Sequence, residues 1–112
     1  MVKLKPGQII NLNFDPVAGH EQGGHRPAVV VSNEFGLKRH NVAYICPITT
    51  TKKPYPTHIP LDERTKTTGV VLCEHMKSLD LSKRPFTYIE SLPDEVFEKV
   101  VFAVSSLIRL PE

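Results

Sequence analysis

The sequence predicts a small, mainly β fold in which an antiparallel, barrel-like sheet is followed by one C-terminal α-helix. Two observations lead to this class: short β-branched or alternating segments separated by Pro, Gly and Asn, and a last segment whose apolar residues recur at helical spacing. With 112 residues, 40% of them hydrophobic and 23% charged, the chain is long enough for one core and short for two. We therefore expect a single domain over residues 1–112.

The predicted strands follow one another along most of the chain. Ile10, Leu12 and Phe14 alternate with asparagines, which is typical of a half-buried strand. Residues 28–31 form a continuous β-branched run that is too short for a helix, so we expect this strand to be buried on both faces. The other predicted strands are residues 42–48, 57–61, 69–73 and 87–90, with a turn at 33–41 and an extended segment at 74–80.

Residues 93–110 are predicted to form an amphipathic helix. Val96, Val100 and Val104 recur every four residues and would line one face of it. Pro93 suits the first turn of a helix, because a proline there sacrifices no hydrogen bond. We expect this helix to pack against the sheet.

Charge and cysteine usage narrow the function only slightly. The formal net charge of +2 is weak support for nucleic-acid binding, so contacts to phosphate must come from locally placed cations. Cys46 and Cys73 lie in β-like runs without zinc-site spacing and are interpreted as buried small hydrophobes. No signal-peptide core and no run of 18 apolar residues is present, so we expect a cytoplasmic protein. The candidate phosphate-binding cations are Arg26, Lys52, Lys53, Lys77, Lys83 and Arg84.

Residues 19–27, Gly-His-Glu-Gln-Gly-Gly-His-Arg-Pro, are the most informative stretch of the chain. They gather a carboxylate, two imidazoles, a guanidinium and three glycines directly before a predicted buried strand. A plain polar turn would explain the glycines. Arg26 favours a functional site, because a guanidinium at the mouth of a rigid strand can bind phosphate through two N–H groups.

A second candidate segment follows the predicted strand at 42–48. Thr49, Thr50, Lys52 and Lys53 place hydroxyls and cations where that strand ends. Threonines also suit an edge strand, so this segment becomes a candidate site only if it meets Arg26 in space.

Several stretches of the chain resemble the MazF/PemK/Kid family of toxins. They are Pro-Gly-Gln-Ile-Ile at 6–10, Gly-x-Glu-Gln-x-Gly-x-Arg-Pro at 19–27, Cys-Pro-Ile-Thr-Thr at 46–50, residues 69–79 and the terminal helix. The resemblance implies an SH3-like barrel, a two-fold homodimer, and sequence-specific cleavage of single-stranded messenger RNA without metal or cofactor. It also implies a cognate antitoxin whose flexible acidic tail occupies the RNA groove.

The resemblance assigns catalytic roles to Arg26 and Thr49, the catalytic pair of the MazF branch, and it also matches Glu21. The Kid branch instead uses a histidine, an arginine and an acidic residue. His20 stands at the matching histidine position, and Glu74 stands in place of the Kid aspartate. Because Leu72 occupies the position of the Kid arginine, the sequence favours the Arg26/Thr49 mechanism.

RNA cleavage by the neighbouring 2′-hydroxyl needs a proton acceptor, stabilisation of the phosphorane and a proton donor to the leaving 5′-oxygen. Arg26 stays protonated and therefore suits phosphate binding and the leaving group, while Thr49 can donate a hydrogen bond to a phosphate oxygen. The base is either Glu21, whose match spans both branches, or His20, whose imidazole titrates nearer neutral pH.

Other residues are expected to contact RNA without taking part in the chemistry. Tyr55 lies between two prolines and is expected to be exposed and available for stacking on a base. The complete set of expected RNA contacts is Gln22, Thr50, Lys52, Lys53, Tyr55, Glu74 and Lys77. The remaining histidines, His25, His40, His58 and His75, lack His-Glu-x-x-His spacing, so we expect no metal site.

An alternative function is a non-catalytic, gyrase-poisoning module of the CcdB type, which shares the fold. Those relatives depend on a tryptophan near the C-terminus, and this chain contains no tryptophan. The sequence therefore favours the ribonuclease.

Overall fold

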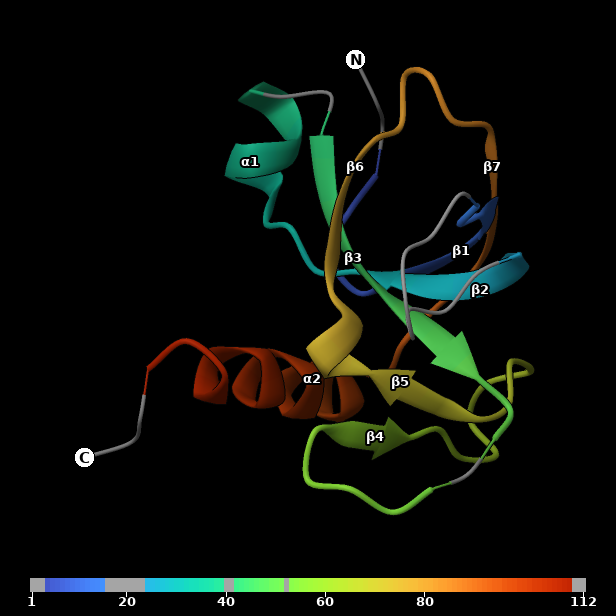
Figure 1. Cartoon of the computed structure of the whole chain (residues 1–112), viewed down its shortest axis with the longest axis vertical. Helices are drawn as coiled ribbons and strands as arrows, with labels where there is room; N and C mark the ends of the chain where they lie inside the picture. The colour runs from blue at the N-terminus through green and yellow to red at the C-terminus, as the bar shows by residue number, and fades with distance from the viewer. Residues whose placement is uncertain (1–3, 16–23, 40–41, 52, 110–112) are drawn as a thin grey trace.

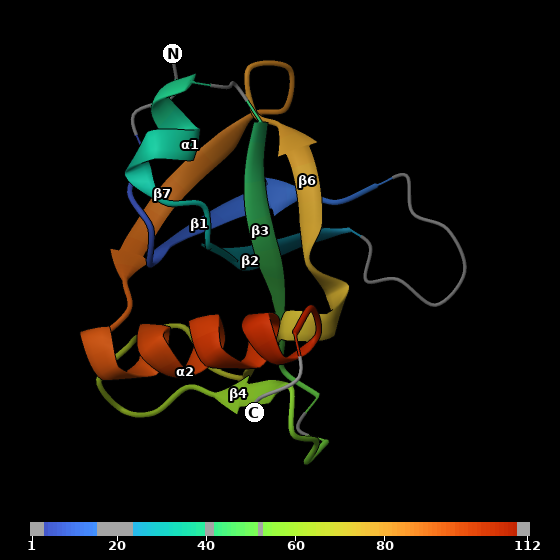
Figure 2. The same cartoon turned by 90° about the vertical axis from the view of Figure 1, so that its left-hand side faces the viewer.

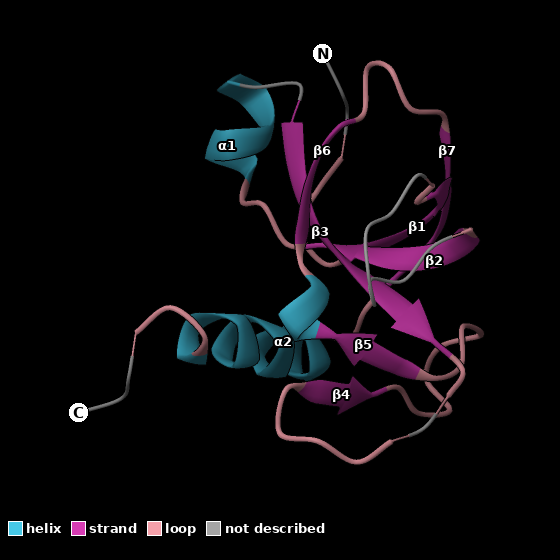
Figure 3. Cartoon of the chain, in the orientation of Figure 1, coloured by secondary structure: helices cyan, strands magenta, loops and turns pink. Residues whose placement is uncertain are grey.

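The fold consists of seven short strands and a C-terminal helix, as seen in a computed structural model that describes residues 4–15, 24–39, 42–51 and 53–109. The strands are β1 (Gln8–Asn13), β2 (His25–Val30), β3 (Val42–Thr49), β4 (His58–Pro60), β5 (Val70–Leu72), β6 (Lys77–Asp80) and β7 (Phe86–Ser91). The helices are α1 (Glu34–Arg39), the single 3-10 turn η1 (Cys73–His75) and α2 (Asp94–Ser106). Figures 1 and 3 show their arrangement.

The strands pair antiparallel in the order β4-β5-β3-β2-β1-β7, and β6 pairs with β3 as well. β3 joins the two parts of the sheet, because its first half pairs with β6 and its last residues pair with β5. In Figure 1, β3 runs through the middle of the fold and ends beside β5. This arrangement confirms the predicted antiparallel, barrel-like sheet with a C-terminal helix.

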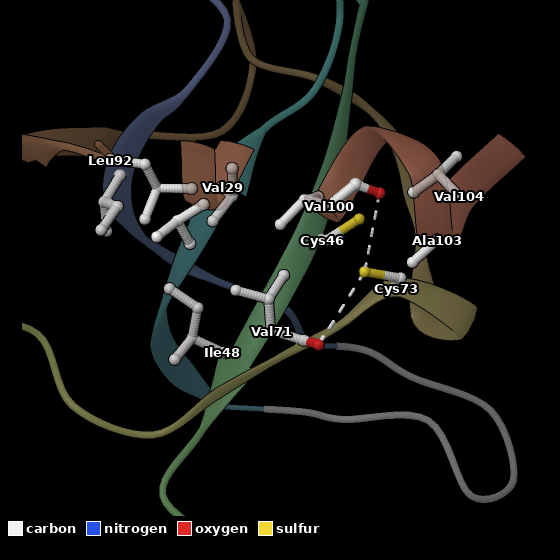
Figure 4. Packing of buried hydrophobic residues seen from close by; sticks show 11 residues of the cluster. Val29, Cys46, Ile48, Val71, Cys73, Leu92, Val100, Ala103 and Val104 are labelled. Carbon is white, nitrogen blue, oxygen red and sulfur yellow. Dashed lines mark hydrogen bonds between the residues drawn. The ribbon is translucent and has the colours of Figure 1, made fainter. Parts of the chain in front are cut away.

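Helix α2 covers one face of the sheet (Figure 2). Its residues Val96, Val100, Ala103 and Val104 are buried, which confirms the predicted apolar face. Figure 4 shows Val100, Ala103 and Val104 on the side of α2 that faces Cys46 and Cys73. The sheet and its connections add Ile9, Val29, Cys46, Ile48, Val71, Cys73 and Leu92 to this core.

A second core lies on the other face of the sheet. Neighbouring residues of one strand enter different cores: Val29 packs toward α2, whereas Ala28 and Val30 pack on the opposite side. The predicted burial of this strand on both faces is therefore confirmed. The second core also contains Leu4, Ile10, Leu12, Phe14, Leu37, Ala43, Ile45 and Leu81, so the alternating strand at 10–14 faces it as predicted.

Cys46 and Cys73 are both fully buried and both free, which confirms that they serve as small core residues. The Cys73 thiol lies 3.9 Å from the carbonyl oxygens of Val71 and Val100 (Figure 4). The hydrogen bond with Cys73, together with burial, raises the pKa of the Cys46 thiol far above its ordinary value. Such thiols are poor nucleophiles and act through packing.

The prediction of a plain turn at 33–41 was wrong, because residues 34–39 form the short helix α1. Asn33 caps it: its side-chain Oδ1 accepts the Gly36 N–H at 2.8 Å and its carbonyl accepts the Leu37 N–H at 3.0 Å. Leu37, 3% exposed, anchors the helix to the second core. One anchor in six residues gives no readable helical period, so the sequence pattern could not reveal it.

Other boundaries also differ from the predictions. β2 begins at His25 rather than at 28, so Arg26 lies within this strand and not before it. In the segment predicted to be extended, only β6 (Lys77–Asp80) is extended, and the chain before it makes the 3-10 turn η1. Helix α2 ends at Ser106 rather than at 110, because Leu107 and Ile108 are 52% and 77% exposed and find no core to pack against. Within the described ranges, no helix is both long enough and apolar enough to span a membrane.

Candidate functional site

The candidate site lies where β3 ends. Thr49, the last residue of β3, is half-buried and pairs with Val70 of β5. Gly69 brings the two strands together: a Cβ on this residue would lie 2.1 Å from the Thr49 carbonyl oxygen, and its φ is +119°. Only glycine fits this close approach, so Gly69 fixes the backbone position of Thr49.

An open pocket of about 270 Å³ lies beside Thr49. The end of β3, the connection to β4, β4 itself, and the β5–η1 segment supply its walls. The lining residues are Thr49, Thr51, Lys53, His58, Leu72, Glu74 and His75. The pocket therefore joins a hydroxyl expected to contact phosphate with a lysine and two histidines.

His58 is held by acceptors on both ring nitrogens. Nδ1 lies 2.8 Å from the Lys53 carbonyl oxygen, and Nε2 lies 2.5 Å from Oε2 of Glu74. A carbonyl and a carboxylate both accept hydrogen bonds, so each ring nitrogen of His58 faces an acceptor. These two contacts fix the orientation of the imidazole at the pocket.

Glu74 is held in its ionised form. Burial alone would raise the pKa of its carboxyl group, but hydrogen bonds from His58, its own backbone and Thr57 outweigh burial and lower that pKa. The Thr57 hydroxyl donates to Oε1 at 2.8 Å, while His58 occupies Oε2. Because both carboxylate oxygens are engaged, Glu74 contributes to the pocket mainly by orienting His58.

Arg26 lies at the same end of the sheet as Thr49. In the antiparallel β2–β3 pair, Ala28 is opposite Pro47. Arg26 precedes Ala28 by two residues and Thr49 follows Pro47 by two, so both extend beyond the same end of the paired stretch. The backbone of Arg26 is paired with Leu12 of β1, and its side chain is half-buried. Arg26 itself is not among the residues that line the 270 Å³ pocket.

The structure gathers part of the predicted site. Thr49, Lys53 and Glu74 line one pocket. Tyr55 is 62% exposed, as expected, and its ring lies 5.3 Å from that of His58 at an interplanar angle of 46°. Thr50 is exposed and Lys77 is half-buried in β6, and neither lines the pocket. His20, Glu21, Gln22 and Lys52 lie outside the described residues.

His58 and His75 were not expected in the site, and both line the pocket. His58 lies on β4 opposite Leu72 of β5, and its partner Glu74 is sixteen positions further along the chain. Strand pairing creates this contact, so no local spacing could have revealed it. Among the described residues, no group of three or more His, Cys, Asp or Glu side chains could hold a metal ion.

Comparison with known proteins gives the family. Residues 5–108 match the family model described as PemK-like, MazF-like toxin of type II toxin-antitoxin system. Endoribonuclease EndoA of Bacillus subtilis (strain 168) is 32% identical over 112 residues, covering 96% of both chains.

Solved structures agree with this result. The crystal structure of MazF (Form-I) from Deinococcus radiodurans has a TM-score of 0.87 at 36% identity, covering 94% of this chain and 96% of that one. The crystal structure of MazE-MazF (Form-II) from the same organism has a TM-score of 0.83 at 34% identity, covering 99% and 100%. The matches extend over nearly the whole chain, and they include the strands and the 3-10 turn that form the pocket. The chain therefore belongs to the PemK-like, MazF-like toxins of type II toxin–antitoxin systems.

Proposed function

We propose that this toxin is a cytoplasmic, metal-independent endoribonuclease that cleaves single-stranded RNA. The observation that carries the proposal is the pocket at the end of β3, which Thr49, Lys53 and the oriented imidazole of His58 line together. Arg26 lies at the same end of the strand pair. An RNA phosphate entering there would meet a hydroxyl donor and several cations, which is the environment that phosphoryl chemistry requires. The similarity to an endoribonuclease of Bacillus subtilis supports the same reading.

The proposed reaction uses the substrate's own nucleophile. The 2′-oxygen attacks the neighbouring phosphorus, a new O–P bond forms, and the bond to the 5′-oxygen breaks. The products are a 2′,3′-cyclic phosphate and a 5′-hydroxyl. Because the nucleophile belongs to RNA, this route needs no metal-bound water.

Each role falls to a named residue. Arg26 binds the phosphate, stabilises the phosphorane, and stabilises or protonates the departing 5′-oxygen. Thr49 donates its hydroxyl proton to a phosphate oxygen, since its Oγ1 already accepts the Thr51 N–H at 3.3 Å. Both ring nitrogens of His58 are already engaged by acceptors within the protein. The proposed proton acceptor is Glu21 or His20.

RNA bases would be held beside the pocket. Tyr55 presents an exposed ring next to His58, which suits stacking on an unpaired base. Lys53 supplies charge for neighbouring phosphates, together with Lys52 and Lys77. Gln22, Thr50 and Glu74 are proposed as further contacts, with Glu74 acting through His58.

The test uses one RNA sequence prepared with three different sugars at the cut site: ribose, 2′-deoxyribose and 2′-O-methylribose. In EDTA, the all-ribose RNA should be cleaved and leave a 2′,3′-cyclic phosphate, while substrates with 2′-deoxy or 2′-O-methyl sugar at that position should stay intact. Denaturing electrophoresis and mass spectrometry of the fragments give the answer. Cleavage of the 2′-deoxy substrate would contradict the mechanism. Intact RNA together with inhibition of DNA gyrase would support the non-catalytic alternative.

We further propose that the toxin is a homodimer. Exposed apolar side chains occur on two surfaces: Phe35, Val42 and Tyr44 around α1 and β3, and Phe102 and Ile108 on and beyond α2. Exposed apolar groups of this kind are surfaces that a second copy can cover in a two-fold dimer. The family resemblance implies the same assembly.

A cognate antitoxin with a flexible acidic tail is the proposed partner. A similar protein of Deinococcus radiodurans has been crystallised as a MazE-MazF complex, and carboxylates on an extended peptide can occupy a groove built for phosphates. We therefore expect an acidic peptide and RNA to compete, with both affinities falling as salt is added.

Titration supplies the measurement for this competition. A fluorescently labelled peptide that alternates Glu with Leu or Phe is bound to the toxin and displaced with 2′-deoxy-substituted RNA. The expected result is complete loss of the bound-peptide signal at saturating RNA. A stable ternary complex of toxin, peptide and RNA would show that the two ligands use separate surfaces.

A further inference from the structure

Arg84 makes contacts that the sequence did not lead us to expect. It lies in the turn between β6 and β7, and we counted it among the candidate phosphate-binding cations. In the structure its Nη1 instead donates to the main-chain carbonyl oxygens of Asn13 at 2.6 Å and Asp15 at 2.9 Å. The guanidinium thus joins the β6–β7 turn to the end of β1, about seventy residues away in the sequence.

The end of β1 is in turn tied to the start of β2. The Asp15 carboxylate accepts the Gly24 N–H at 3.0 Å, and the Phe14 N–H donates to the Gly24 carbonyl oxygen at 2.9 Å. The Asp15 N–H also donates to Oδ1 of Asn13 at 3.0 Å. Gly24 is the residue directly before β2, and Arg26 follows it by two positions.

These bonds form one connected group, which we call the strand clamp: Arg84, Asn13, Phe14, Asp15 and Gly24. Its contacts are short and charge-assisted at the guanidinium, so they restrain the backbone more strongly than ordinary turn contacts. Leu12 pairs with Arg26 on one side of β1 and with Phe86 on the other. The strand clamp therefore holds β1 next to Leu12, the residue whose backbone pairs with Arg26. The guanidinium reaches β1 from the turn that leads into β7.

We propose that Arg84 is a positioning residue for RNA cleavage, which fixes the backbone of β1 and, through it, places Arg26 against the scissile phosphate. The inference rests on the proposed ribonuclease function. A guanidinium stabilises a transition state only if its two donors are aimed accurately, and a displacement of about 1 Å by a remote change can lower a rate on the order of 10²-fold. Arg84 acts on the reaction through Arg26, without contacting RNA.

Three variants test the proposal in steady-state kinetics on a short fluorogenic RNA. Arg84→Ala should lower kcat on the order of 10- to 100-fold with little change in KM, because alignment is lost while substrate binding is kept. Arg84→Lys should recover part of this loss, since a single ammonium can donate to both carbonyls. Arg109→Ala removes the same charge from an exposed residue beyond α2 and is the control, with kinetics like the wild type.

A double-mutant cycle with Asp15→Ala separates positioning from general stability. If Arg84 and Asp15 hold the same junction, Asp15→Ala should lower kcat by much less in the Arg84→Ala background than it does in the wild type. Strictly multiplicative effects would mean that the two residues act independently, which overturns the proposal. A different result would be a raised KM at unchanged kcat in Arg84→Ala, together with an RNA affinity whose salt dependence falls by about one phosphate contact. This result would identify Arg84 as a direct RNA ligand and would also overturn the proposal.

Hydrogen exchange gives a readout that needs no activity. The Phe14 and Gly24 amides both donate within the strand clamp, so their exchange should accelerate at least several-fold in Arg84→Ala, while amides of α2 keep their wild-type rates. Unchanged exchange at Phe14 and Gly24 would disprove the clamp even if the kinetics changed. Failure of the wild type to cleave RNA would refute the proposed function and leave the clamp supported by exchange alone. If Arg84→Ala does not fold, Arg84→Lys carries the same measurements.

Discussion

Arg26→Ala is expected to lower the rate of RNA cleavage on the order of 100-fold or more, because one charged donor to the phosphorane is lost. The backbone of Arg26 is paired with Leu12, which is 1% exposed, so truncating the side chain leaves the strand and its core contacts in place. Circular dichroism should therefore be unchanged. Single-turnover cleavage of a defined transcript measures the effect without interference from product release.

Arg26→Lys distinguishes charge from geometry. A lysine keeps the positive charge but lacks the planar fork that binds two phosphate oxygens, so this variant should also be severely impaired. Near-normal cleavage by the lysine variant would show that a point charge is sufficient and would remove the main argument for bidentate binding. For Arg26→Ala, which does remove a charge, Arg109→Ala is again the control.

The sequence pattern predicted the main architecture because burial follows alternation in a strand and a period of about four residues in a helix. Val29 and Val30 pack into different cores, and Val96 and Val100 line one face of α2. The short helix α1 was missed because only Leu37 anchors it. The end of α2 was placed too late because Leu107 and Ile108 continue the apolar period although the described part of the same chain leaves them exposed.

The candidate site was only partly predictable for a related reason. Arg26 could be selected because it precedes a strand that the sequence pattern predicts, and Thr49 could be selected because it follows another such strand. The pairing of His58 with Glu74 could not be selected, since it depends on β4 lying beside β5 and on the turn η1. Arg84 resembled any other surface cation in the sequence, and only the path of β1 reveals that its donors serve main-chain carbonyls. Long-range pairing therefore determines the parts of the site that local patterns miss.

Gly69→Ala is expected to be the most damaging glycine-to-alanine substitution among the glycines that the structure describes. The added Cβ would lie 2.1 Å from the Thr49 carbonyl oxygen, 2.8 Å from its carbonyl carbon and 3.2 Å from Cα of Thr50. All three atoms are backbone, so no side-chain rotation relieves the overlap. Left-handed strain of about 1–2 kcal/mol adds to overpacking of about 1–3 kcal/mol, so the free energy of unfolding should fall by roughly 2–5 kcal/mol.

The same substitution should damage catalysis beyond its effect on stability, because β3 and β5 must separate at Thr49. At a temperature where the variant is still folded, cleavage should fall on the order of 10²-fold. Two other glycines provide matched controls. At Gly7, φ is +88° but the nearest atom, Cγ of Phe97, is an ordinary 3.5 Å from a new Cβ, so Gly7→Ala isolates backbone strain. At Gly36, in α1, the nearest atom is 3.6 Å away, so Gly36→Ala should be neutral or stabilise by up to about 1 kcal/mol through helix propensity.

Urea unfolding at one fixed protein concentration orders the three variants, since any subunit association makes stability depend on concentration. The expected order of destabilisation is Gly69→Ala, then Gly7→Ala, then Gly36→Ala. If Gly69→Ala unfolds with the same midpoint as Gly7→Ala and cleaves RNA normally, the close approach between Gly69 and Thr49 is not what positions the hydroxyl. Because the three substitutions add the same methyl group, differences among them report the local backbone geometry alone, and a selective loss of cleavage in Gly69→Ala would tie that geometry to Thr49.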